Sequence, residues 1–165
     1  MENLGKASEN RPLWKISKTI YRIIVAVDLE VERIGLRTIL SRYAEIYKVV
    51  GEASNCNDLM NLLDRYECDI LVTDFLIPEV NASLDGIILL RELRNRHTEL
   101  QIITLISFRD AEIVRILHSE GVRAVVEKTS AEKILDALRV VKAGHIYISE
   151  RVQGKPTSHT PSRGR

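Results

Sequence analysis

Two aspartates, each directly after a run of apolar residues, are the side chains in this sequence whose placement suggests chemistry. Asp28 ends the run 21–27, and Asp74 ends the run 70–73. Short runs rich in β-branched residues are typical of buried strands. In a parallel α/β sheet, ligands bind at the C-terminal ends of the strands, so both carboxylates are candidate site residues. For Asp74 the alternative is a turn residue that only closes its strand.

Lys128, which follows a third apolar run at 122–127, is the next candidate. Two carboxylates one strand apart would form an oxygen-rich pocket for a hard divalent cation such as Mg²⁺. A flexible lysine ammonium from a nearby strand would neutralise an anion bound there. A carboxylate, a cation and a lysine around one point suit phosphoryl transfer.

Alternating strand and helix patterns must position these residues. The expected strands are 21–28, 47–53, 70–74, 100–106 and 122–128. The expected helices are 31–40, one through Leu59, Leu62 and Leu63 after capping side chains at 54–58, 85–97, 110–120, and a last one from a capping box at 129–132 to Gly144. Five such units without a repeat predict a parallel, doubly wound α/β sheet. Right-handed crossovers favour the flavodoxin-like strand order 2-1-3-4-5, which places Asp28 and Asp74 at the switch point between strands 1 and 3.

The composition indicates one domain with a substantial core. The chain has 165 residues, of which 45% are hydrophobic and 28% charged. Its apolar stretches are far shorter than the roughly 20 residues that cross a bilayer, and its N-terminus lacks the apolar core of a signal peptide, so we expect a cytoplasmic protein without a membrane partner. Cys56 and Cys68 lack the spacing of a metal site or redox pair.

The net charge of +1 conceals basic ends and an acidic body. Residues 1–20 carry four Lys/Arg and two Glu, and residues 151–165 carry four Lys/Arg and no acid. Subtracting both ends from the totals of 24 and 23 leaves 16 basic and 21 acidic residues, a net of −5. This argues against a nucleic-acid-binding core. We expect a flexible N-terminal extension at 1–20, a folded domain at 21–150 and a flexible basic tail at 151–165.

Several motifs stand in a specific order along the body. They are Asp28, the run Val72-Thr73-Asp74 followed by Pro78 and Asp85-Gly86, the pair Lys128-Thr129, and the closing segment from Lys142 to Ser149. With these motifs, residues 21–150 resemble the receiver domain of two-component response regulators, most closely the NarL/FixJ type.

The resemblance implies a role for each site residue. Asp74 would be the phosphoacceptor, and Asp28, Asp74 and the backbone carbonyl of Leu76 would hold Mg²⁺. Lys128 would contact the phosphoryl group. A carboxylate nucleophile that forms an acyl phosphate beside Mg²⁺ is ordinary covalent catalysis.

The resemblance also implies partners. The phosphodonor would be a histidine kinase or a phosphotransfer protein. The helix 110–120, the strand 122–128 and the last helix would form the face of a homodimer, although their mixed charges suit a solvated face equally well. The chain would be a signalling domain, with at most autocatalytic phosphoryl transfer and dephosphorylation on Asp74. No helix-turn-helix pattern follows the domain, so no DNA-binding domain is expected within this chain.

Two positions depart from the family's pattern. Val27 stands where the family has the first of two adjacent acids, which predicts weaker Mg²⁺ binding, and we expect Glu30 to be solvated rather than to compensate. Ile106 stands where the family places the Ser or Thr that hydrogen-bonds the phosphoryl oxygen, and isoleucine has no donor. Ser107 should face the other side of the sheet.

These departures leave two classes of function open. One is a phosphorylatable switch, and the other is a degenerate receiver that acts as a phosphorylation-independent binding or dimerisation module. A flavin-binding enzyme is a weaker third class, because the segment 29–32 after the first strand has no glycine and two glutamates that would repel a cofactor phosphate.

Overall fold

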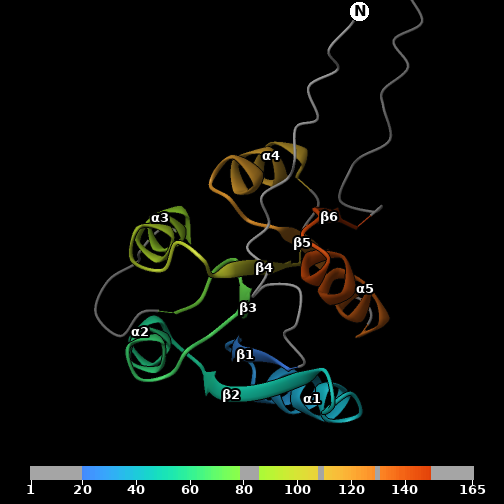
Figure 1. Ribbon diagram of the computed structural model, residues 1–165. Helices are drawn as coiled ribbons and strands as arrows, with labels where there is room; N and C mark the ends of the chain where they lie inside the picture. The colour runs from blue at the N-terminus through green and yellow to red at the C-terminus, as the bar shows by residue number, and fades with distance from the viewer. Residues whose placement is uncertain (1–19, 79–85, 108–109, 129–130, 150–165) are drawn as a thin grey trace, which may run out of the picture.

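The computed structural model describes residues 20–78, 86–107, 110–128 and 131–149, which form one layer of strands between two layers of helices (Figure 1). The elements are, in order, β1 (Tyr21–Ala26), α1 (Glu30–Ser41), β2 (Tyr47–Ala53), α2 (Cys56–Arg65), β3 (Ile70–Asp74), α3 (Gly86–Arg96), β4 (Gln101–Ile106), α4 (Ala111–Ser119), β5 (Ala124–Glu127), α5 (Ala131–Lys142) and β6 (Tyr147–Ile148). The extension and tail expected before residue 20 and after residue 150 lie outside the described residues.

All the strands are parallel, in the order β2-β1-β3-β4-β5-β6. The predicted doubly wound order 2-1-3-4-5 is therefore confirmed, with β2 at one edge. The short strand β6 was not predicted, because two residues are too few to show an alternating pattern. It extends the sheet beyond β5, where Ala124 pairs with Tyr147 and Val125 with Ile148.

Alternation along each strand divides the core into two halves. Ile24, Leu71 and Ile102 point to the face that α2, α3 and α4 cover, whereas Ile23 and Val72 point to the face covered by α1 and α5. Figure 1 shows these two groups of helices on opposite sides of the sheet. Buried on both faces, the central strands read as continuous apolar runs, which is typical of parallel sheets.

Local signals account for where several elements begin and end. Asn55 caps α2 by accepting the backbone N–H of Asp58, and Asp110 caps α4 by accepting those of Glu112 and Ile113. Gly121 follows α4 with a φ of 87°, a left-handed conformation that favours glycine. Among the described elements, no helix is long and apolar enough to span a membrane.

Neither cysteine forms a disulfide with another described residue. Cys56, the first residue of α2, is buried. Burial also raises the pKa of the Cys68 thiol to about 12, so this side chain stays protonated at neutral pH and is a poor nucleophile.

Candidate functional site

The C-terminal ends of β1 and β3 place Asp28 beside Asp74. The two strands pair with Val25 opposite Val72 and Ala26 opposite Thr73, so they end side by side. The backbone N–H of Asp28 donates to Asp74 Oδ2 over 3.1 Å. Asp74 is only 6% exposed, whereas Asp28 is exposed. One carboxylate is thus buried at the strand end while its neighbour faces solvent.

Lys128 reaches the same point from the end of β5, although β4 separates β5 from β3. Its Nζ lies 2.6 Å from Asp74 Oδ1. The backbone N–H of Lys128 donates to the carbonyl of Ile106 over 2.9 Å, which sets the direction of the chain after β5. The structure therefore brings the side chains of Asp74 and Lys128 together, with the backbone N–H of Asp28 bound to the same carboxylate.

The electrostatics of this cluster follow from burial and from the ion pair. Burial raises the pKa of Asp74 above its ordinary value, although the bonds from Lys128 and from the Asp28 amide pull it down. Burial opposes the charged form of Lys128, but its bonds to Asp74 and Glu32 outweigh this and raise its pKa. Lys128 is consequently a fixed cation at neutral pH.

Glu32 and Arg33, in the first turn of α1, belong to the cluster, and sequence reasoning missed both. Glu32 Oε2 accepts from Lys128 Nζ over 2.8 Å, and Arg33 Nη1 donates to the backbone carbonyls of Val27 and Asp28, each over 2.6 Å. At helical spacing, Glu32 and Arg33 lie on the polar side of the predicted helix 31–40, which by itself indicates only contact with solvent. Their position in the sequence could have indicated this role, because a helix that starts two residues after Asp28 must begin at the same end of the sheet as Asp28.

Val27 and Ile106, the two positions that depart from the family's pattern, are both buried core residues. Val27 is 0% exposed and packs on the α1 and α5 side. Ile106 is 1% exposed and packs on the opposite side, with side chains of α3 and α4. Ser107, which follows the last residue of β4, is exposed. Both positions are therefore occupied by apolar side chains packed in the core, and neither can offer an oxygen ligand or a hydrogen-bond donor.

Gly86 allows the start of α3 to approach the residue that follows Asp74. A Cβ at this position would lie 2.2 Å from the backbone oxygen of Phe75, a distance that real Cβ atoms do not reach. The glycine thus helps to determine the path of the chain beside the site. Asp85 and Thr129, which the sequence also singled out, lie outside the described residues.

The oxygen atoms at this edge suit Mg²⁺ better than a softer metal. Asp28 and Asp74 offer carboxylate oxygens, and the chain at Leu76 follows directly after β3. In the part of the chain that the structure describes, no group of three or more His, Cys, Asp and Glu side chains is arranged to hold a metal ion. This donor set fits a cation that keeps several of its own waters, as Mg²⁺ does.

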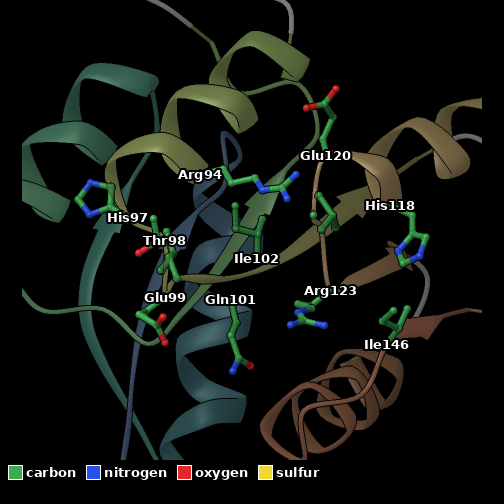
Figure 2. Close-up of a pocket in the computed structure, with 13 residues that line it drawn as sticks. Arg94, His97, Thr98, Glu99, Gln101, Ile102, His118, Glu120, Arg123 and Ile146 are labelled. Atoms are coloured by element: carbon green, nitrogen blue, oxygen red, sulfur yellow. The ribbon is translucent and has the colours of Figure 1, made fainter.

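A recess of about 420 Å³ lies at the N-terminal ends of the strands, on the opposite end of the sheet from Asp74 (Figure 2). It is lined by Arg94, His97, His118 and Arg123, among others, from the ends of α3 and α4 and the segments before β4 and β5. These are the N-terminal ends of the strands, whereas Asp74 and Lys128 lie at the C-terminal ends. The recess is therefore separate from the candidate site.

The chain matches a protein-family model. The profile described as "Response regulator receiver domain" matches residues 23–139, which include most of β1, all of β2 to β5 and most of α5.

The chain is also similar to proteins named as transcriptional regulators. The chain is 24% identical over 140 residues to the transcriptional regulatory protein DegU of Brevibacillus brevis, covering 84% of this chain and 57% of DegU. It is 28% identical over 144 residues to the transcriptional regulatory protein LiaR of Bacillus subtilis, covering 87% of this chain and 66% of LiaR. The chain thus spans less than two thirds of the length of these relatives.

Solved structures with the same fold include the isolated REC domain of RcsB from Salmonella enterica serovar Typhimurium in the presence of phosphomimetic BeF₃⁻. Its TM-score is 0.73 at 26% identity, over 80% of this chain and 95% of that domain. The non-phosphorylated receiver domain of RcsB from Escherichia coli also gives 0.73, at 25% identity, over 79% and 98%. A structure of two RcsB dimers bound to two parallel DNAs gives 0.73 at 26% identity, over 80% of this chain and 65% of that one.

Proposed function

The chain belongs to the response regulator receiver domain family, and we propose that it accepts a phosphoryl group on Asp74 from a histidine kinase or a phosphotransfer protein. The observation that carries this proposal is the ion pair of 2.6 Å between Asp74 Oδ1 and Lys128 Nζ. It joins a buried carboxylate to a cation at the end of the sheet where ligands bind. Accepting a phosphoryl group is typical of this family of signalling domains.

In the proposed reaction, a carboxylate oxygen of Asp74 forms a bond to phosphorus. The bond between phosphorus and the donor's leaving atom breaks, and its electron pair stays with the donor. Lys128 is placed to neutralise charge on the transferred group, while the Asp28 amide holds Asp74 Oδ2. Asp28, Asp74 and the backbone carbonyl of Leu76 would hold Mg²⁺, which would supply further neutralisation. Any catalysis on a small phosphodonor, and the later loss of the phosphoryl group, would also take place on Asp74.

A second candidate function is a receiver that binds a partner or a second copy without phosphorylation. The burial of Val27 and Ile106 favours it, because the pocket has one strand-end acid fewer than the family pattern and no hydroxyl at Ile106.

We propose residues 21–150 as the folded unit, in agreement with the family match at 23–139 and with β6 ending at 148. From the family's signalling role we also infer a cytoplasmic location.

Intact mass spectrometry after incubation with a small phosphodonor and Mg²⁺ tests the proposal. The wild-type chain should gain the mass of one phosphoryl group, in an acid-labile form. Asp74→Asn keeps the shape of the side chain without the nucleophile and should show no gain. Asp28→Asn is the matched control, since it removes a carboxylate from the same pocket but leaves Asp74, and should gain the group more slowly.

A mass gain that persists in Asp74→Asn would refute the assignment of the phosphoacceptor. If the wild-type chain gains no mass although the donor phosphorylates a control receiver domain, the second candidate function is favoured.

A further inference from the structure

The ammonium of Lys128 is shared between two carboxylates that come from different parts of the chain. Its Nζ lies 2.6 Å from Asp74 Oδ1, at the end of β3, and 2.8 Å from Glu32 Oε2, in the first turn of α1. A lysine ammonium has three N–H donors and no acceptor, so these contacts occupy two of the three donors. The side chain of Lys128 is only 19% exposed, so little water is at hand to replace either carboxylate.

We propose that Glu32 competes with the phosphoryl group for Lys128, and that it thereby lowers the affinity of the pocket for an anionic phosphodonor. The inference rests on the proposed function, because it concerns the lysine of that same site. Once Asp74 forms the acyl phosphate, its own carboxylate charge is lost, and the phosphoryl oxygens replace it as acceptors for Lys128. Glu32 keeps its charge throughout, so it competes for the same ammonium before and after the transfer.

The charge of Glu32 acts in the same direction as this competition. Its Oε2 can be no farther from Asp74 Oδ1 than the sum of the two contacts with Lys128, about 5.4 Å. A phosphoryl group is strongly negative at neutral pH, and like charges at this range repel each other near a protein surface. The Glu32 side chain is 33% exposed, so water screens the repulsion only in part. Glu32 therefore opposes an anion at Asp74 through both its contact and its charge.

A tether that holds Lys128 towards Asp74 is the opposite role for Glu32, and the geometry disfavours it. Lys128 contacts Asp74 directly, over the shorter of the two distances. Its backbone N–H is bound separately by the carbonyl of Ile106. Lys128 thus has two anchors at this end of the sheet that do not depend on Glu32.

Arg33 keeps Glu32 within reach of Lys128. Its Nη1 donates to the carbonyls of Val27 and Asp28, which ties the first turn of α1 to the end of β1. Glu30 is exposed in the same turn, and residues two apart on a helix point to different sides. Glu30 is therefore a matched control, with the same charge in the same turn but on another side of the helix.

The test is how phosphorylation depends on the concentration of acetyl phosphate, followed by intact mass of the full chain at a fixed Mg²⁺ concentration. Glu32→Gln should lower the half-saturating donor concentration about five-fold, as expected for one partly exposed charge pair, while the limiting rate changes less. Glu30→Gln should stay within about two-fold of the wild type. Glu32→Asp keeps the charge on a shorter side chain and should fall between the wild type and Glu32→Gln.

Beryllofluoride affinity is a second measurement, and it involves no chemical step. Binding to the full chain, followed by NMR with Mg²⁺ present, should be about five-fold tighter in Glu32→Gln than in the wild type or in Glu30→Gln. A merely structural role of Glu32 would lower the stability of the fold and would not tighten the binding of an anion.

The outcomes separate this inference from the proposed function. If the wild type and Glu32→Gln gain the phosphoryl group with the same donor dependence, the inference is overturned and the proposed function stands. A higher half-saturating concentration and weaker beryllofluoride binding in Glu32→Gln would overturn it in favour of a tether. If neither chain gains mass nor binds beryllofluoride, the inference fails together with the proposed function. A gain confined to Glu32→Gln would support the inference, and would show that Glu32 prevents phosphorylation of the wild-type site under these conditions.

Discussion

Lys128 Nζ lies 2.6 Å from Asp74 Oδ1, although the two residues follow strands that are not neighbours in the sheet. The long lysine side chain passes the end of β4 to reach the end of β3. Because Asp74 is buried, this ion pair is the main attraction that offsets the cost of holding a carboxylate there. The same contact therefore affects both the stability of the fold and the chemistry of the site.

Asp74 should make the fold less stable as the pH rises. Its pKa in the folded chain lies above the ordinary value of 3.8, so the folded state binds more protons than the unfolded state between these two values. Stability is then lost as pH rises through this window, by about 1.4 kcal/mol for each unit of elevation. Asp74→Asn removes this titration. The variant should therefore be more stable, relative to wild type, at pH 7 than at pH 3.5.

Urea unfolding of both proteins at the two pH values measures the effect. The difference between the variant and wild type isolates Asp74, since the other groups titrate in both. A difference that does not change with pH, or that favours the wild type more at pH 7, would contradict the elevated pKa.

Gly86→Ala should destabilise the fold by at least about 2 kcal/mol, because the new Cβ would clash with the backbone oxygen of Phe75 rather than with a movable side chain. Gly35→Ala is the control, since nothing lies within 4 Å of its Cβ position in α1. That change should be neutral or stabilise by about 0.5–1 kcal/mol. Thermal unfolding followed by circular dichroism measures the stability of both variants. Equal changes in stability would show that Gly86 and the backbone oxygen of Phe75 are not in tight contact.

Phosphorylation should change the conformation little in the wild-type chain, because buried Ile106 cannot donate a hydrogen bond to a phosphoryl oxygen. A hydrogen bond to a charged group is worth about 1.5–3 kcal/mol, which changes the equilibrium constant between two conformational states by one to two orders of magnitude. The monomer–dimer constant should respond to beryllofluoride mainly in Ile106→Thr, as measured by analytical ultracentrifugation. A shift of about ten-fold or more in the wild type would assign the switch to another group, such as Ser107.

Self-association, if it uses α4, β5 and α5, should be sensitive to charge on that face. Arg115 is exposed on α4, and Arg139 on α5 pairs with Asp136 over 2.8 Å. Charge reversal at either arginine should weaken the dimer by about 1 kcal/mol, since an exposed charge pair is worth little more. Sedimentation that is unchanged at every concentration would exclude this face, and Arg96→Glu on α3 provides a control away from it.

The sequence by itself indicated β1 to β5, their order in the sheet and the three residues at the centre of the candidate site. Buried parallel strands must be apolar along their whole length, so the acids at 28 and 74 and the lysine at 128 are visible as the points where these runs stop. The order of the strands then follows from the handedness of their connections. These are rules that act over short stretches of chain, and a sequence displays them directly.

Only the tertiary structure decided that Glu32 and Arg33 belong to the site, and that β6 joins the sheet. The bond between Glu32 and Lys128 links residues 96 positions apart, and it depends on how α1 is rotated and packed on the sheet. A helical pattern shows only that Glu32 is polar and faces away from the core. Whether such a face meets water or a lysine from a distant strand is determined by packing, which no local pattern of residues contains.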